Sequence, residues 1–282
     1  MKHPETFHDL IGLDLGTREI GWTERDAILY AIACGAGADE LDLVYERDLR
    51  PLPGLVSALG LWAVEQCGDL GVYDRKKSLH VSQGIEIHAP GIRAPEGGAF
   101  LPRNARFPAQ GRVAAVWDKG KATIVEIEVV SEIFTATYSI FLPGVGGWGG
   151  VNAPAAVRAD AAPALTPVAE YATSPGQAVL YRLTGDLHPV HVDVEVARSY
   201  GFERPILHGL CTLGIALRLL GPASGSHPAA LQSATARLSA PVLPGDVLTV
   251  RAASWDGGLG FDVVAGDRQV LKDGWVRYAS GR

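Results

Sequence analysis

The pattern of hydrophobic and polar positions repeats in the two halves of the chain. In the first half, residues 23–36 (TERDAILYAIACGA) carry apolar side chains at helical spacing, and Thr23, Glu24 and Asp26 form a typical helix start. Residues 111–142 hold three runs rich in β-branched and aromatic residues, separated by DKGK and VSE, which predicts antiparallel strands. Residues 51–76 carry no pattern that predicts one structure.

The second half repeats this order of elements. A helix is predicted at 209–220, followed by strands at Val247–Ser254, Leu259–Ala265 and Gln269–Tyr278 that are joined by glycine-rich turns. The stretch 144–170 between the halves has no periodicity and is rich in Gly, Ala and Pro, as linkers are. We therefore predict an α+β fold with an N-terminal unit at 1–150, a linker at 151–170 and a C-terminal unit at 171–282, because no strands and helices alternate as a parallel fold requires.

Composition excludes several classes of partner. The 282 residues are 47% hydrophobic and 20% charged, as expected of a well-packed soluble protein, and the formal charge of −6 disfavours nucleic acid and anionic membranes as partners. No stretch reaches the ~18 consecutive apolar residues of a membrane span, and the start, MKHPETFHDL, does not resemble a signal peptide. Three cysteines, far apart, suggest neither disulfides nor a zinc site, so we expect a cytoplasmic protein.

Candidate chemistry is concentrated in residues 181–220, which contain three of the eight histidines. Gly185 and Pro189 bracket Asp186 and predict a turn, where a carboxylate and the imidazole of His191 can be directed at one point. A short helix follows, with Asp193 as N-cap and Gly201 as its end.

The predicted helix that begins at Gly209 is apolar almost all round and should be buried. A glycine at its start lets a ligand approach the unpaired N–H groups at the positive helix end, a favourable place for a developing oxyanion. One short region thus combines an acid, a base and electrophilic backbone groups.

These residues resemble a known family. YRLTGDLHPVHVD followed by GFERPILHGLCTLG is similar to the signature of the MaoC-like, type 2 enoyl-CoA hydratases. WTERDAILYAIACGA, LHVSQ, VWDKGKAT and ARLSAPVLPGD occur in the order seen in the long members, so the resemblance covers essentially the whole chain. It implies a double hot-dog fold, in which each of two units wraps an antiparallel sheet around a central helix, and a homodimer.

The resemblance also implies an activity, the reversible hydration of trans-2-enoyl-CoA to (R)-3-hydroxyacyl-CoA. Asp186 and His191 match the pair that activates water, and the N–H of Gly209 matches the group that polarises the thioester carbonyl. No cofactor is needed for this chemistry. The residues matched to substrate binding are His80, Val81, Lys119 at the CoA portion, Leu238 in the pocket wall, and His188, which stands where the family usually has Asn.

Other interpretations remain open at this stage. Asp186 and His191 could merely stabilise a turn, and His208 could brace the loop before the helix. Bound metal is disfavoured, because the histidines lack a carboxylate at zinc-site spacing. A hot-dog thioesterase and a non-catalytic acyl-CoA binding protein are alternative functions. Since the N-terminal half has no counterpart of GDLHPVH, we expect it to accommodate the acyl chain and each chain to hold one site.

Overall fold

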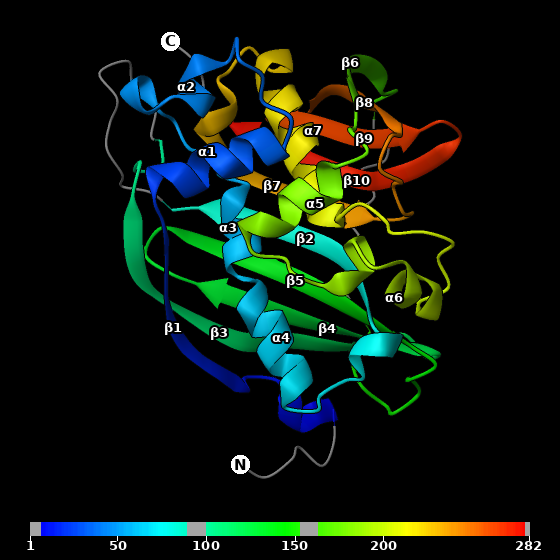
Figure 1. Cartoon of the computed structure of the whole chain (residues 1–282). Helices are drawn as coiled ribbons and strands as arrows, with labels where there is room; N and C mark the ends of the chain where they lie inside the picture. The colour runs from blue at the N-terminus through cyan, green and yellow to red at the C-terminus, as the bar shows by residue number, and fades with distance from the viewer. Residues whose placement is uncertain (1–6, 89–99, 153–162, 280–282) are drawn as a thin grey trace.

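One ten-stranded antiparallel sheet runs through both halves of the chain (Figure 1). The computed structural model describes residues 7–88, 100–152 and 163–279. The strand order is β1-β3-β4-β5-β2-β7-β10-β9-β8-β6. The strands are β1 Asp14–Trp22, β2 Leu79–Ile87, β3 Ala105–Asp118, β4 Ala122–Val130, β5 Phe134–Pro143, β6 Thr166–Ala172, β7 Leu231–Leu238, β8 Val247–Trp255, β9 Gly258–Ala265 and β10 Arg268–Tyr278.

The helices lie in front of the sheet in Figure 1 and divide between its two halves. The α-helices are α1 Glu24–Ala33, α2 Leu41–Val44, α3 Leu55–Leu59, α4 Leu61–Asp69, α5 Gln177–Tyr181, α6 Val194–Ser199 and α7 Gly209–Ala223. Short 3₁₀ turns are η1 Phe7–Leu10, η2 Glu46–Asp48, η3 Arg75–Lys77, η4 Arg182–Thr184, η5 Pro189–His191 and η6 Pro228–Ala230. No helix among the described residues is both long and apolar enough for a bilayer span.

The sheet consists of two units with the same topology. Reading inward from each edge, β1-β3-β4-β5-β2 corresponds to β6-β8-β9-β10-β7, and β2 pairs with β7 in the middle, with Gly84 opposite Thr235. The helix α7 packs on the second unit, whereas α3 and α4 pack on the first. The α+β prediction is therefore confirmed, with a repeat of strand, helices and four further strands.

Most elements predicted from the sequence are present. Thr23 caps α1 in a capping box with Asp26, because each side chain accepts the other residue's backbone N–H. The predicted helix at 209–220 is α7, and six predicted strands are β3, β4, β5, β8, β9 and β10. The unit boundaries stay a prediction, with one correction: β6 occupies Thr166–Ala172, so the end of the predicted 151–170 linker is strand. Residues 153–162 lie outside the described ranges.

Residues 51–76, unassigned from the sequence, form the broken helix α3–α4 of the first unit. The break is caused by a contact with strand β5. The Ser57 carbonyl, which would accept from Leu61 in a continuous helix, accepts a 2.7 Å hydrogen bond from the Tyr138 hydroxyl of β5. Gly60 stands at the break because a Cβ there would collide with that hydroxyl. The interruption hides the 3.6-residue period over this segment.

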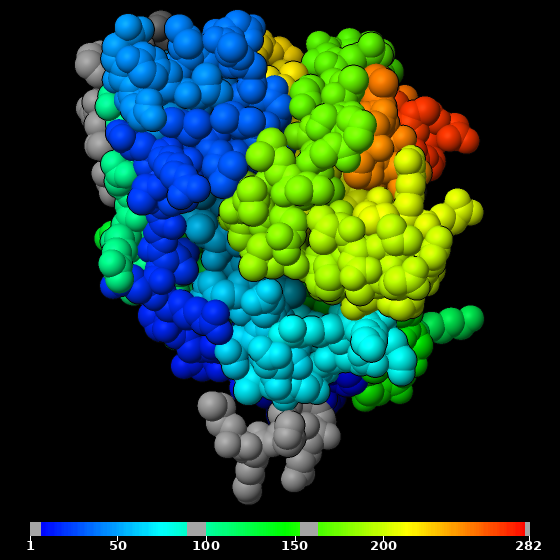
Figure 2. Space-filling model, in the orientation of Figure 1, coloured from blue at the N-terminus to red at the C-terminus, as the bar shows by residue number. Residues whose placement is uncertain are grey.

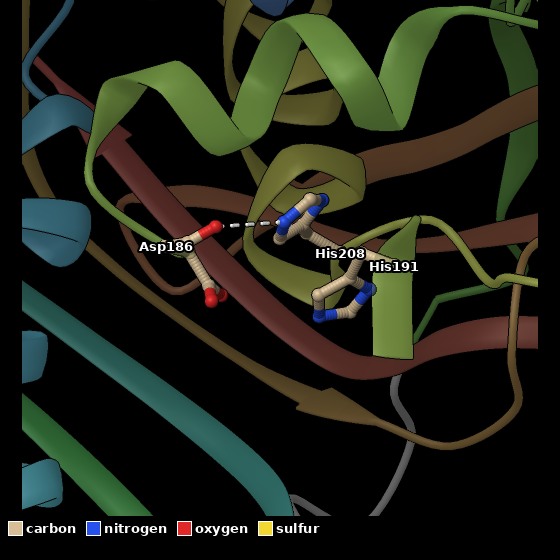
Figure 3. A group of neighbouring side chains, drawn as sticks. All are labelled: Asp186, His191 and His208. Carbon is tan, nitrogen blue, oxygen red and sulfur yellow. Dashed lines mark hydrogen bonds between the residues drawn. The ribbon is translucent and has the colours of Figure 1, made fainter. Parts of the chain in front are cut away.

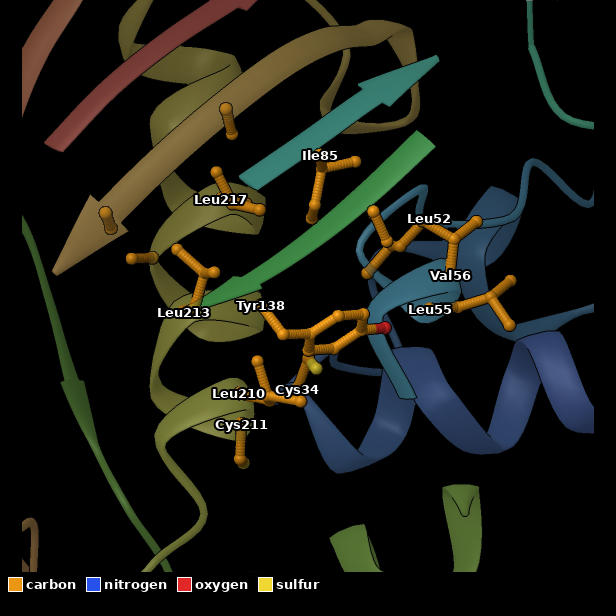
Figure 4. Packing of buried hydrophobic residues seen from close by; sticks show 14 of the residues in the cluster. Cys34, Leu52, Leu55, Val56, Ile85, Tyr138, Leu210, Cys211, Leu213 and Leu217 are labelled. Atoms are coloured by element: carbon orange, nitrogen blue, oxygen red, sulfur yellow. The ribbon is translucent and has the colours of Figure 1, made fainter. Parts of the chain in front are cut away.

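A single core joins the two units. Figure 4 shows Leu210, Leu213 and Leu217 of α7 on one side of Tyr138, and side chains of the α3 segment, including Val56, on the other. All of these residues are buried and belong to one contiguous cluster. The start of α7, where the candidate site lies, is thus fixed by packing against both units.

Candidate active site

The loop from η4 to α6 carries Asp186 and His191 over the first turn of α7. It turns at Gly185, whose φ of +134° is rarely open to other residues, and a Cβ there would lie 3.5 Å from the Ala58 carbonyl oxygen of α3. Asp193 caps α6 through the N–H groups of Glu195 and Val196, as predicted. The loop that carries Asp186 and His191 in the second unit therefore lies against a helix of the first.

Asp186, His191 and His208 converge, and each contributes a polar atom to a group whose atoms all lie within 4.8 Å of one another. In Figure 3 the Asp186 carboxylate and the His191 ring extend to the same side, and His208 lies against His191. Sequence analysis placed Asp186 and His191 together, and the structure does bring them together. His208, which was expected to brace the loop before the helix, is itself a member of this group.

Main-chain carbonyls fix the orientation of both rings. His191 Nδ1 donates to Ile206 O at 2.9 Å, so the neutral ring leaves a lone pair on Nε2, the nitrogen a base would use. His208 Nε2 donates to Asp186 O at 3.2 Å, and its buried Nδ1 has no partner among the described residues. His191 is therefore held in the tautomer that can accept a proton.

Burial opposes charge on each member of this group. It raises the pKa of Asp186 above its ordinary value, although the His188 N–H and the His188 ring oppose the shift. Burial lowers the pKa of His191 to about 4 and that of His208 to about 2. At neutral pH the site thus contains two neutral imidazoles and a carboxyl group that holds its proton more strongly than an exposed aspartate does.

The N-terminus of α7 supplies electrophilic groups. The helix begins at Gly209, as predicted, and its preceding residue, His208, gives no side-chain cap. The first backbone N–H groups of a helix lack intrahelical acceptors, so they are available to a ligand oxygen. A Cβ on Gly209 would lie 2.8 Å from Leu238 Cδ1, which places Leu238 directly against the helix start.

Two other predicted residues lie on the neighbouring strand β2. Because Ser82 pairs with Arg237, His80 and Val81 continue β2 beside the end of β7, where Leu238 lies. His80 Nε2 donates to Ser82 O at 3.0 Å, and burial lowers the pKa of His80 to about 4. Sequence analysis missed Gln83, which is fully buried and whose Oε1 has no partner among the described residues. A single glutamine within a strand pattern does not reveal from the sequence that it will be buried with an unpaired oxygen.

The remaining predicted residues have other surroundings. Lys119 is exposed in the β3–β4 turn, where its N–H donates to Ala122 O at 2.8 Å, so its contact with CoA stays a prediction. Both ring nitrogens of His188 meet protein atoms, Val190 N and the Tyr200 hydroxyl. His191 and His208 each use one ring nitrogen for a hydrogen bond to a main-chain carbonyl. The expectation that no metal binds to Asp186 and these two rings stays a prediction.

Fold and site together define a double hot-dog chain with an acid, a base and a helix N-terminus in its second unit. Residues 159–275 match the MaoC like domain, and residues 21–142 match the MFE-2 hydratase 2 N-terminal domain. The chain therefore belongs to the MaoC-like hydratase 2 family. The resemblance seen in the sequence, and the double hot-dog fold that it implied, are confirmed.

The chain is similar to individual relatives along most of their length. Enoyl-CoA hydratase ChsH3 of Mycobacterium tuberculosis is 35% identical over 267 residues, which are 88% of either chain. The peroxisomal enoyl-CoA hydratase 2 of Arabidopsis thaliana is 36% identical, with 80% of each chain covered. The crystal structure of a MaoC-like dehydratase from Phytophthora capsici superposes with a TM-score of 0.82 at 26% identity and covers 96% of both chains.

Proposed function

We propose that the chain is a hydro-lyase that reversibly hydrates trans-2-enoyl-CoA to (R)-3-hydroxyacyl-CoA. The observation that carries this proposal is the convergence of Asp186 and His191 in front of the first turn of α7. His191 presents a free Nε2 lone pair, and burial raises the pKa of the Asp186 carboxyl above its ordinary value. Relatives named enoyl-CoA hydratase and 3-hydroxyacyl-thioester dehydratase support the same reaction class.

The proposed roles use the free Nε2 lone pair of His191 and a proton on the Asp186 carboxyl. His191 Nε2 removes a proton from water while the water oxygen bonds to the β-carbon and the C=C π electrons move toward the thioester carbonyl. The Gly209 N–H stabilises the negative charge that develops on that carbonyl oxygen. Collapse of the enolate takes the Asp186 proton onto the α-carbon, and transfer of the proton from His191 back to Asp186 restores the site. No cofactor enters this balance.

We place the acyl chain in the first unit. Leu238 on β7 stands beside Gly209, and His80 and Val81 continue β2 beside the end of β7, so these three are the proposed walls of the entrance to the acyl pocket. The first unit has no counterpart of the GDLHPVH motif, and after its helix α1 Glu40 forms a 2.8 Å ion pair with Arg218 of α7. This supports one catalytic site per chain, and titration that yields two equivalent CoA sites per chain would contradict it.

The other proposals concern CoA and assembly. Lys119 is the proposed contact for the CoA phosphates, and His188 remains a proposed neighbour of the substrate. We further propose a cytoplasmic homodimer with no nucleic-acid or membrane partner, to be checked by light scattering and by localisation of the tagged chain. Replacing Lys119 by Ala should raise KM for the CoA thioester more than KM for the matching pantetheine thioester.

The deciding test follows the enoyl absorbance of crotonyl-CoA and of a longer trans-2-enoyl-CoA, with chiral analysis of the product. Asp186→Asn and His191→Ala should each lower kcat by about 10² to 10⁴-fold, and native protein should form the (R)-alcohol. Thiol release without a hydroxyacyl product would instead identify a thioesterase, and CoA binding without turnover would identify a binding protein.

A further inference from the structure

His188 connects the two proposed catalytic residues through its main chain. Its N–H donates to Asp186 Oδ1 at 3.2 Å, and its carbonyl accepts from the His191 N–H at 3.4 Å. Its side chain caps η5, because Nδ1 accepts from the Val190 N–H at 3.2 Å. A change in the His188 ring therefore acts on the turn that sets the distance between acid and base.

The far side of the ring is held by another element. Tyr200 directly follows α6, and its hydroxyl lies 3.3 Å from His188 Nε2. The two rings meet edge to face, with centroids 5.4 Å apart and planes at 85°. Both nitrogens of His188 thus have partners, one within the catalytic loop and one beyond it.

These partners select one protonation state. A backbone N–H can only donate, so Nδ1 must carry a lone pair, and the proton of the neutral ring must lie on Nε2, where the Tyr200 oxygen accepts it. A cationic ring would carry hydrogen on Nδ1 and set two donors against each other at Val190. Protonation of His188 is therefore incompatible with the cap.

The charged surroundings do not favour the cation. Asp186 and His191 face His188 from its own loop, Tyr200 from α6, Arg75 from η3 and Glu65 from α4. Figure 2 shows the α5–α6 segment lying against the α4 region on this face. Burial lowers the pKa of His188 below its ordinary value, His191 and Arg75 act in the same direction, and Asp186 and Glu65 oppose them.

We propose that His188 is a positioning residue: its Nε2–H tautomer holds the Asp186–His191 pair in the active arrangement, and proton uptake by His188 switches the site off as the pH falls. An asparagine at this place could cap the same turn, because its side-chain oxygen accepts from backbone N–H groups, but it could not take up the proton. The predicted effect on catalysis rests on the proposed hydratase function. The predicted tautomer of His188 rests only on its hydrogen bonds.

The tautomer is tested first, on the whole protein labelled with ¹⁵N-histidine. Correlation spectra distinguish protonated from unprotonated ring nitrogens, and the His188→Asn variant assigns the signals by their loss. We expect an unprotonated Nδ1 at neutral pH that gains a proton as the pH falls. A ring with its proton on Nδ1 at neutral pH overturns the proposal, whether or not the protein turns over enoyl-CoA.

The catalytic consequence is tested by profiles of kcat/KM against pH, each scaled to its own maximum. Below the pKa of His188 the native rate should fall by at least the roughly fivefold that loss of the cap costs, and this step should be absent from the profile of His188→Asn. His188→Ala, which loses the cap, should lose about fivefold more of its maximum rate than His188→Asn. Tyr200→Phe, which keeps the cap and the titrating ring, should retain the native decline. Coincident profiles for native protein and His188→Asn would refute the switch.

Discussion

His191 and His208 stack with their ring centroids 3.6 Å apart and their planes 24° from parallel, and each ring hydrogen-bonds to the other's loop. His191 donates to Ile206 O, two residues before His208, and His208 donates to Asp186 O, five residues before His191. The loop that carries Asp186 and His191 and the loop that leads into α7 are therefore tied to each other by reciprocal hydrogen bonds around one stacked pair.

Replacing His208 by Ala should reduce activity without removing a reacting group. The substitution removes the stack and the donor to Asp186 O, and displacement of the acid or base by about 1 Å can cost about 10²-fold in kcat. His227→Ala is the matched control, because His227 is a half-buried histidine paired with Asp42 at 2.9 Å outside the proposed site. Equal kinetics for the two variants would show that His208 has no positioning role.

Stability should fall as the pH drops below about 6.5, the ordinary histidine pKa. Burial lowers the pKa values of His80 and His191 to about 4 and that of His208 to about 2, so the folded chain keeps these rings neutral. The unfolded chain binds more protons in this window, and each ring then removes up to about 1.4 kcal/mol of unfolding free energy per pH unit. Thermal unfolding at pH 7, 6 and 5 measures this loss. An unchanged Tm over this range would mean that the rings titrate normally in the folded state.

Replacing Gly209 by Ala should lower kcat, because a new Cβ 2.8 Å from Leu238 Cδ1 forces the helix start and the side chain apart. Shortening the opposing side chain should relieve this conflict. We expect the Gly209→Ala, Leu238→Ala double variant to be more active than Gly209→Ala alone, measured as kcat/KM on one enoyl-CoA. If the losses of kcat/KM in the two single variants simply add in the double variant, the new methyl group does not act through Leu238 but through contact with the substrate.

Replacing Glu40 by Gln should destabilise the protein by about 2 kcal/mol, or about 5 °C in Tm. Arg218 on α7 is 7% exposed and bonds both Glu40 and Cys34 O, so the substitution leaves a buried guanidinium without its counter-ion. The control is Glu195→Gln, whose partner Arg198 is largely exposed, and its cost should stay below about 0.5 kcal/mol. Equal changes in Tm for the two variants would mean that the buried Arg218–Glu40 pair contributes no more to stability than the exposed Arg198–Glu195 pair.

Removal of divalent metals should leave hydration unchanged, because acid, base and oxyanion donors all come from the protein. Dialysis against EDTA followed by the crotonyl-CoA assay checks this expectation. A loss of activity restored by Zn²⁺ would assign the Asp186, His191 and His208 group to a metal instead.

The sequence predicted those elements whose signals are local. The capping box of Thr23 and Asp26 and the alternation in β4 and β5 follow from neighbours a few residues apart. Segment 51–76 escaped prediction because its helix is interrupted by Tyr138, a residue 81 positions after Ser57. The start of β6 lay in a stretch whose Ala- and Pro-rich composition resembles a linker.

For the candidate site, too, the sequence predicted only what depends on residues close together in the chain. Asp186, His191 and Gly209 lie close enough in sequence for a turn and a helix start to bring them together. The stack of His191 on His208 and the contact of Tyr200 with His188 depend on how loops close over α7, which no spacing encodes. Gln83 became notable only when burial left its oxygen unpaired.

The pairing of β2 with β7 makes the two units one continuous hydrogen-bonded ladder from β1 to β6. Hinge motion between the units would have to break that ladder at the middle of the sheet. For the acyl pocket proposed above, substrate range would then change through individual side chains of β2 and β7, with the sheet unchanged.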